Sequence, residues 1–293
     1  KKKNSSSIIV YANKDKKTNL LIYDSINKIL SKNDILAPKL LSENYSKNFI
    51  EIHDLGNQTI FNLLKKNKVN KFIIFKQIIR LLIKIQLIPE RRIKNFKNYF
   101  YKIPTYDKKI LLEEAKLFTD WYVAKKLSKS QQIIFKKKFV KILNNLIKKL
   151  CLKNNIFVHR DFHLSNLMMV GNKIGVIDSQ DALIGNKAYD LASLIDDVRF
   201  KTTESIKKKV FSFYLKSQKK INIKNFKNDF EIISVLRNLK IIGIFTRLAI
   251  RDNKKKYLKL IPHAWNLIYL RSKKSDKFKD LNGLLNIFKK NFV

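Results

Sequence analysis

The spacing of apolar and polar residues changes along this chain, and the change separates two regions. Near the N-terminus, residues 8–12 and 48–52 have the short apolar runs of β-strands, and residues 20–30 between them have a helical period. After the turn signal at residues 54–57 the spacing is helical almost throughout. We therefore expect an α+β protein with a small β-containing N-terminal part followed by a large, mainly helical part.

The helical part contains several long periodic segments. In residues 108–127 the apolar side chains of Leu111, Ala115, Phe118 and Tyr122 recur at helical spacing. Residues 134–149 and 231–251 also read as long helices, and only six glycines and four prolines interrupt the 293 residues. Residues 155–181 are an exception, because they combine short apolar runs with turn residues. We expect strands there, inside the helical part.

Composition indicates in which cellular compartment we expect the protein. The chain has no uncharged apolar run of about 18 residues, so we expect no membrane span, and it shows no signal peptide. Cys151 is the only cysteine, which excludes an internal disulfide and a cysteine-based metal cluster. These features are typical of a cytoplasmic protein.

The formal net charge of +40 suggests nucleic acid or an acidic membrane surface at first sight. However, the lysines are spread over the whole chain, whereas a binding patch is expected to be clustered. We expect them to solvate the surface, with no specific nucleic-acid partner and no obligate protein partner. The lysine runs at 207–209 and 254–256 keep the binding alternative open.

Within residues 155–181, Gly171-Asn172 separates two apolar runs and is a signal for a two-residue hairpin turn. A hairpin folded there pairs Val170 with Lys173 and, four positions further back, Asn166 with Ile177. Since paired strands lie ~4.8 Å apart, Asn166 and Asp178 should emerge side by side. An amide and a carboxylate brought together in this way are oxygen ligands that suit Mg²⁺.

Asp161 precedes Asn166 by five residues, which is the spacing of a kinase catalytic loop. In that arrangement the aspartate accepts or orients the proton of the acceptor hydroxyl, and the asparagine holds a metal ion at the phosphates. Each of these residues alone could be an ordinary turn or strand-end residue. Together with the hairpin, they favour phosphoryl transfer with Asp161 as the catalytic base.

At this point the sequence resembles the aminoglycoside phosphotransferase/choline kinase superfamily, whose loop reads His-x-Asp-x-His-x-x-Asn, as do His159, Asp161, His163 and Asn166 here. The stretch from Gly185 to Ala192 is similar to the superfamily's Gly-x-x-x-x-Asp-Leu-Ala sequence. The resemblance implies a two-lobe, protein-kinase-like fold that uses ATP and Mg²⁺. It also implies that His159 and Asp190 support the catalytic loop.

Residues 177–182 are similar to the Asp-Phe-Gln-Asp-Ala sequence of the bacterial N-acetylmuramate/N-acetylglucosamine kinases. Further stretches resemble theirs: Ala37-Pro38 with residues 52–56, Glu114-x-x-x-Phe118-x-x-Trp121-Tyr122, and Arg247-x-x-x-Arg251-Asp252. The resemblance implies transfer of the ATP γ-phosphoryl group to the anomeric hydroxyl of an N-acetyl amino sugar. Another small alcohol (choline, an aminoglycoside or another sugar) is an alternative acceptor, and a non-catalytic basic binding protein on the same fold is a second alternative.

The resemblance also suggests binding residues. Backbone near Glu51 and His53 would receive the nucleotide, and the acceptor would meet His163, Asp181, Glu114, Trp121, Arg247 and Arg251. Glu114 lies along an aromatic face that suits a sugar, but an ion pair with the N-terminal lobe is an equal alternative. The two arginines suit a phosphate or a carboxylate, or else a salt bridge with Asp196, Asp197 or Asp252.

Three features depart from the kinase pattern. Ser179 replaces the usual phenylalanine, which removes a packing contact, and Gln180 offers a neutral oxygen in place of an acidic ligand. No glycine-rich phosphate loop precedes Ile8, and the only candidate for a loop that would cover the nucleotide phosphates is Ser5-Ser6-Ser7. We therefore expect residues 1–56 to form an incomplete nucleotide-binding lobe with the hinge, and residues 57–293 the C-terminal lobe. We also expect this chain to bind ATP weakly, and an upstream extension to restore binding.

Overall fold

The structure is a computed structural model that describes residues 6–66 and 69–292. Residue contacts divide the chain into two units. The first consists of Lys1–Thr105, Asn154–Leu194 and Glu204–Ser217, and the second of Tyr106–Lys153, Ile195–Thr203 and Gln218–Val293. The predicted lobe boundary after residue 56 falls inside the first unit and stays a prediction. Ser5 of the suggested phosphate loop lies outside the described residues.

The first unit contains all the strands of the described chain. Its elements, in order, are β1 (Ser7–Tyr11), η1 (Lys14–Lys16), α1 (Thr18–Lys32), β2 (Leu40–Asn44), β3 (Phe49–His53), α2 (Ile60–Lys65), α3 (Lys71–Gln86), β4 (Arg92–Lys94), β5 (Phe100–Lys102), β6 (Asn154–Val158), η3 (Leu164–Asn166), β7 (Leu167–Val170), β8 (Lys173–Val176), β9 (Leu183–Asn186), α7 (Tyr189–Ile195) and α8 (Glu204–Lys216).

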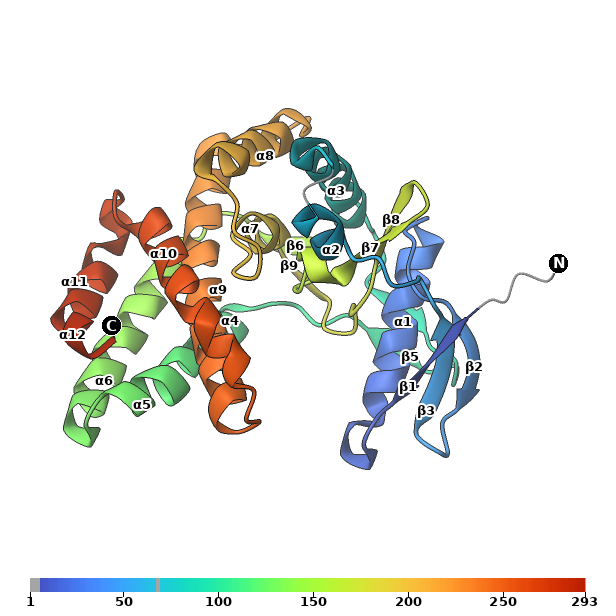
Figure 1. The fold of residues 1–293 in the computed structure, drawn as a ribbon, viewed down its shortest axis with the longest axis horizontal. Helices are drawn as coiled ribbons and strands as arrows, with labels where there is room; N and C mark the ends of the chain where they lie inside the picture. Colours follow the sequence, from blue (N-terminus) through green and yellow to red (C-terminus); the bar gives the residue numbers. More distant parts are fainter. Residues whose placement is uncertain (1–5, 67–68, 293) are drawn as a thin grey trace. The chain divides into compact units, whose positions relative to one another are not determined.

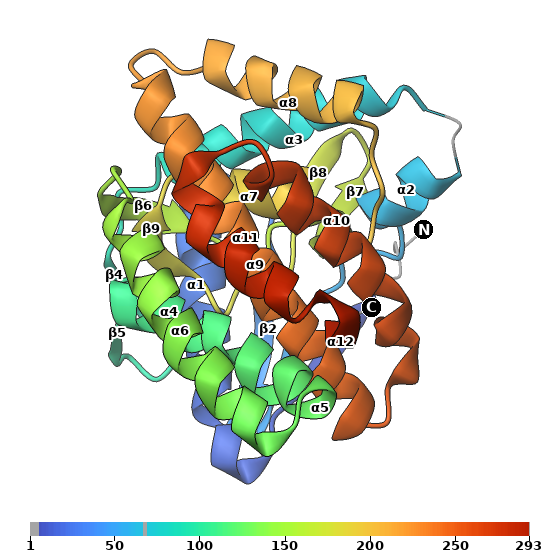
Figure 2. The same ribbon diagram turned by 90° about the vertical axis from the view of Figure 1, so that its left-hand side faces the viewer.

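The predicted N-terminal strands and helix are confirmed, and they pack together. β3 is the central strand of an antiparallel sheet with the order β1-β3-β2, and α1 lies beside this sheet (Figures 1 and 2). Because side chains alternate along a strand, Ile50 and Ile52 of β3 are buried against Leu20 of α1, whereas Glu51 points to the other face. The hydrophobic pattern thus fixes which face of the sheet holds the helix.

The helices α3 and α8 lie side by side in both views (Figures 1 and 2). Gln86 at the end of α3 connects them to the chain that precedes α7. Its side chain accepts a 2.7 Å hydrogen bond from the hydroxyl of Tyr214 and donates a 2.9 Å bond to the carbonyl of Lys187. Burial raises the pKa of Tyr214, so this hydroxyl keeps its proton and remains a donor.

The second unit contains helices and no strand among its described residues. Its elements are α4 (Lys108–Leu117), η2 (Phe118–Val123), α5 (Ala124–Lys126), α6 (Lys129–Lys148), α9 (Ile223–Ile250), η4 (Lys255–Leu260), α10 (Ile261–Ser272), η5 (Asp276–Phe278), α11 (Lys279–Ile287) and α12 (Lys289–Phe292). The α+β class predicted from the periodicity is confirmed. α9 starts earlier than predicted, because the Asn222 side chain caps it by accepting a 3.0 Å bond from the backbone N–H of Asn225.

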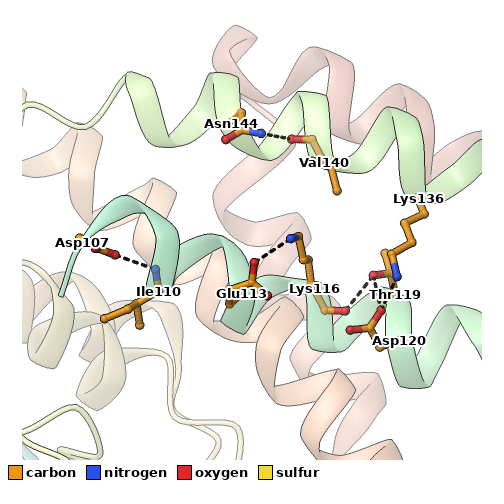
Figure 3. A network of polar contacts seen from close by, with 9 residues as sticks. All are labelled: Asp107, Ile110, Glu113, Lys116, Thr119, Asp120, Lys136, Val140 and Asn144. Atoms are coloured by element: carbon orange, nitrogen blue, oxygen red, sulfur yellow. Dashed lines mark hydrogen bonds and ion pairs between the residues drawn. The ribbon is translucent and has the colours of Figure 1, made fainter.

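The predicted helix over residues 108–127 is confirmed with one change of winding. Asp107 caps α4 by accepting a bond from the backbone N–H of Ile110, and the helix then widens into a π-helix, η2 (Figure 3). An ion pair of 2.8 Å between Asp120 and Lys136 ties η2 to α6 (Figure 3). Gly243 of α9 packs closely against the junction of α4 and η2. A Cβ atom at this position would stand 2.3 Å from the carbonyl of Leu117.

No helix among residues 6–66 and 69–292 combines the length and the apolar content needed to cross a lipid bilayer.

Candidate active site

The hairpin predicted around Gly171-Asn172 is present, with the predicted register. β7 and β8 are antiparallel, Val170 lies opposite Lys173, and the backbone N–H of Ile177 continues the ladder by donating to the carbonyl of Asn166 at 3.0 Å. Gly171 has a φ of 56°, which mirror-image hairpin turns require and which glycine adopts without steric cost. As predicted, the side chains of Asn166 and Asp178 meet, with Nδ2 of the amide 3.4 Å from Oδ2 of the carboxylate.

The segment between Asp161 and Asn166 is a tight loop. The carbonyl of Asp161 accepts bonds from the backbone N–H of His163 at 3.0 Å and from Nδ2 of Asn166 at 3.1 Å. The five-residue spacing therefore places Asp161 directly beside Asn166. Since the amide nitrogen of Asn166 is used within the loop, its Oδ1 atom is left as the group that could bind a metal ion.

Asp190 connects α7 to this loop. Its buried carboxylate accepts hydrogen bonds from two successive backbone N–H groups, those of His159 at 2.7 Å and Arg160 at 2.9 Å. Bonds of this kind to an ionised acceptor are stronger than neutral ones. The contacts support the bracing role expected of Asp190.

His159 is fully buried under the loop, and its Nε2 atom lies 3.1 Å from the carbonyl oxygen of Ile177, the residue before Asp178. Burial lowers the pKa of His159, although the neighbouring carboxylates of Asp161 and Asp178 act in the opposite direction. The neutral ring donates its N–H to that carbonyl. His159 thus links the start of the catalytic loop to the segment that carries Asp178.

Two site residues have a strained backbone. Arg160 has a φ of 75° and Asp178 a φ of 60°, a region that residues other than glycine rarely occupy. Such strain costs about 1–3 kcal/mol for each residue, so surrounding contacts must hold these conformations. The two strained residues lie on either side of the Asp161–Asn166 loop, and backbone strain of this kind clusters at functional sites.

The side chains of the two residues after Asp178 make contacts that the sequence did not indicate. Ser179 is fully buried, and its hydroxyl donates a 2.7 Å bond to Oδ1 of Asn27 on α1, so the missing phenylalanine is replaced by a polar link. Gln180 directs its amide nitrogen, not its oxygen, to Oδ1 of Asp178 at 2.9 Å. Both side chains therefore orient the Asp178 segment. Sequence spacing gave no sign of Asn27, which stands 152 positions away from Ser179.

A cavity of about 620 Å³ opens in the first unit beside these residues. It is large enough for a nucleotide or a similar small molecule. The lining residues are Ile8, Val10, Tyr11, Ala12, Asn13, Lys16, Asn19, Leu20, Tyr23, Pro38, residues 52–56, Asn166, Met168, Ile177, Asp178 and Gln180. The cavity thus combines an apolar wall from the sheet with the two candidate metal ligands.

The predicted nucleotide residues occupy different places around this cavity. His53 lines it, together with the turn that ends at Gly56. Glu51 does not appear among the lining residues of the described chain, because its carboxylate accepts hydrogen bonds from Ser7 at 2.6 Å and Ser42 at 2.8 Å on the opposite face. These bonds lower the pKa of Glu51. The predicted contribution of the Glu51 backbone to nucleotide binding stays a prediction.

Two of the predicted acceptor-binding residues belong to the first unit. His163 is buried within the catalytic loop, where its backbone closes the turn onto Asp161. Asp181 is exposed and lies 3.8 Å from the guanidinium of Arg160. Their roles in acceptor binding stay predictions.

The other predicted acceptor residues belong to the second unit. Glu114 is buried, accepts a bond from the hydroxyl of Tyr106 and forms a 2.8 Å ion pair with Lys240 of α9. Arg251 forms two bonds to Asp252, at 2.7 and 3.0 Å, so the salt-bridge alternative is present for this arginine. The ion-pair partner of Glu114, Lys240, belongs to the second unit, as Glu114 itself does. Both carboxylate–cation pairs compensate charge, and acceptor contacts by these residues stay predictions.

The remaining two residues of the predicted acceptor set have fewer described contacts. Trp121 is half-buried on η2, and Arg247 is half-buried on α9 with its Nε atom buried and without a hydrogen bond in the described chain. The hydrogen bond from Arg251 lowers the pKa of Asp252, and the positive charge of Arg247 adds to this effect. Their proposed contacts with the acceptor also stay predictions.

A loop with kinase-type spacing, an amide and a carboxylate that meet, and an adjacent cavity form the arrangement expected of a phosphoryl-transfer enzyme. The comparison with known families agrees: residues 14–219 match the phosphotransferase enzyme family APH, and the chain belongs to this family. The expected enzyme class, a small-molecule kinase, is thereby confirmed.

Relatives of similar sequence support the same class. The chain is 29% identical over 257 residues to the N-acetylmuramate/N-acetylglucosamine kinase of Neisseria meningitidis serogroup B, covering 85% of this chain and 74% of that protein. It is 28% identical over 255 residues to the enzyme of the same name from Pseudomonas aeruginosa, covering 85% and 72%.

Among solved structures, the fold is similar to a choline/ethanolamine kinase family protein from Mesorhizobium loti, with a TM-score of 0.61 at 9% identity, over 97% of this chain and 87% of that one. It is also similar to aminoglycoside 2'-phosphotransferase-IIIa in its GDP complex, with a TM-score of 0.61 at 12% identity, over 89% and 86% of the two chains. The expected kinase-like fold is confirmed.

Proposed function

We propose that this protein transfers the γ-phosphoryl group of ATP, with Mg²⁺, to the anomeric hydroxyl of an N-acetyl amino sugar. The observation that carries the phosphoryl-transfer part is the meeting of the Asn166 amide and the Asp178 carboxylate beside Asp161. The acceptor part rests on the resemblance to relatives that are named N-acetylmuramate/N-acetylglucosamine kinases.

The donor set fits Mg²⁺. This ion prefers oxygen ligands and is usually held by one or two protein side chains together with substrate phosphates. Oδ1 of Asn166 and the carboxylate of Asp178 supply such ligands at the wall of the cavity. When bound, the ion would neutralise charge on the transferring phosphoryl group.

The protein's own residues have positioning and proton-accepting roles in this proposal. Asp161 accepts or orients the proton of the acceptor hydroxyl, and its backbone is held by the bonds from His163 and Asn166. Gln180 and Asn166 orient the two carboxylate oxygens of Asp178. Phosphoryl transfer needs little covalent chemistry from the protein, so correct placement of these groups contributes most of the catalysis.

The test is an ATP-consumption assay with a panel of acceptors: N-acetylglucosamine, N-acetylmuramate, choline, ethanolamine and an aminoglycoside. We expect turnover with the amino sugars and a product whose phosphate is stable in alkali but labile in acid, as an anomeric phosphate is. Turnover with choline or the aminoglycoside alone would reject the acceptor while leaving the enzyme class intact. Absence of turnover with every acceptor, together with tight DNA binding at physiological salt, would favour the non-catalytic alternative.

A further inference from the structure

The cavity beside Asn166 and Asp178 has an uneven charge distribution. Two carboxylates, those of Asp54 and Asp178, contribute to its wall. Among the described residues that line it, Lys16 is the only lysine or arginine. A nucleoside triphosphate that enters this cavity would therefore meet one cationic side chain.

The position of Lys16 follows from the local fold. From β1 and the residue just beyond it, Ile8, Val10, Tyr11 and Ala12 line the cavity, so the strand itself presents no cation there. The chain then turns through η1, where the backbone N–H of Lys16 donates a 2.8 Å bond to the carbonyl of Asn13. This turn brings Asn13 and Lys16 to the same cavity.

Lys16 also differs from a lysine that is held by a structural ion pair. Its side chain is exposed and makes no ion pair or hydrogen bond within residues 6–66 and 69–292. A flexible four-carbon stem allows its ammonium group to adjust to a ligand, and lysine is a common binder of phosphate. The chain has 63 lysines and arginines, most of which need no function beyond solvation. The place of Lys16 in the cavity wall is what distinguishes it.

We propose that Lys16 binds the phosphate groups of the nucleotide in this cavity. The inference rests on the proposed function, since it presupposes that the cavity receives a nucleotide. The ammonium group offsets the repulsion between the phosphates and the carboxylates of Asp54 and Asp178. A second prediction follows: contacts to the base and ribose should not depend on Lys16.

The experiment compares the unchanged chain with Lys16→Ala, Lys16→Arg and the matched control Lys14→Ala. Lys14 belongs to the same short helix and is exposed, but it does not line the cavity. Binding of MgATP and, separately, of adenosine is measured by calorimetry, together with the KM for ATP. We expect Lys16→Ala to weaken MgATP binding roughly tenfold or more and to leave adenosine binding within about twofold. Lys16→Arg should keep most of the affinity, and Lys14→Ala should resemble the unchanged chain.

Equal MgATP affinity for the unchanged chain and Lys16→Ala would overturn the inference and leave the proposed function standing. Equal losses for MgATP and adenosine would also overturn it, because they would indicate a structural role. If the unchanged chain bound no nucleotide, the proposed function would fail and this inference with it. Thermal unfolding of all variants should coincide, because the described Lys16 side chain makes no contact that folding requires.

Discussion

Replacing Asp190 with asparagine removes one acceptor oxygen from the pair that holds the catalytic loop. In the folded protein the two oxygens accept the N–H groups of His159 and Arg160 at 2.7 and 2.9 Å. A hydrogen bond to a charged group contributes about 1.5–3 kcal/mol, and an amide NH₂ facing a backbone N–H adds repulsion. We expect Asp190→Asn to lower the free energy of unfolding by about 2–4 kcal/mol.

The same change should affect catalysis through Arg160. The φ of 75° at Arg160 costs about 1–3 kcal/mol, which the hydrogen bond that the Arg160 backbone N–H donates to Asp190 offsets in the native protein. If the weakened contact lets Arg160 relax, the productive loop becomes the minor conformer. We expect kcat to fall about 5- to 150-fold, with the KM for ATP nearly unchanged.

Asp229 provides a matched control. Its fully buried carboxylate also accepts two successive backbone N–H groups, those of Cys151 and Leu152, both at 2.8 Å. That loop carries none of the predicted catalytic residues, so Asp229→Asn should cost similar stability but leave the kcat of the folded protein unchanged. Urea unfolding and steady-state kinetics at a temperature where all variants are folded supply both readouts. Full kcat in Asp190→Asn, or equal losses of kcat in both variants, would refute the positioning argument.

Other variants test the remaining parts of the site and fold. Asp161→Asn should reduce kcat by about 10²-fold or more while MgATP still binds, and unchanged turnover of this variant in the acceptor assay would rule out Asp161 as the base. Asp178→Ala should instead weaken Mg²⁺-dependent nucleotide binding itself. Gly243→Ala should destabilise the protein by about 2–3 kcal/mol, because the new Cβ would stand 2.3 Å from backbone atoms of Leu117. Gly283→Ala, with no atom within 4 Å of its Cβ in α11, should instead stabilise it by about 0.5–1 kcal/mol, and calorimetric Tm values distinguish the two.

The parts of the site that could be predicted from the sequence are those fixed by local counting. A two-residue loop determines which residues of a hairpin face each other, so the proximity of Asn166 and Asp178 follows from the position of Gly171. Helical periodicity likewise identified the buried stripe that includes Phe118 and Tyr122. In both cases the information lies within a dozen positions.

The contacts that escaped prediction join distant positions. Ser179 meets Asn27 across 152 positions, and Glu114 meets Lys240 across 126. No periodic pattern encodes such pairs, because they depend on how separately formed elements pack. Lys16 could not be singled out from the sequence for a related reason, because only its place in the wall of the folded cavity distinguishes it from the other basic residues.

The β7–β8 hairpin also limits how the length of this chain can vary. Asn166 lies opposite Ile177 at the end of the β7–β8 ladder, and its side chain meets that of Asp178, the next residue along the chain. Inserting or deleting a single residue in either strand would shift the pairing, so that Asn166 no longer lies opposite Ile177. Lengthening both strands by two residues would restore that pairing. Productive insertions and deletions between these residues should therefore come in matched pairs, while substitutions in the solvent-facing positions are tolerated.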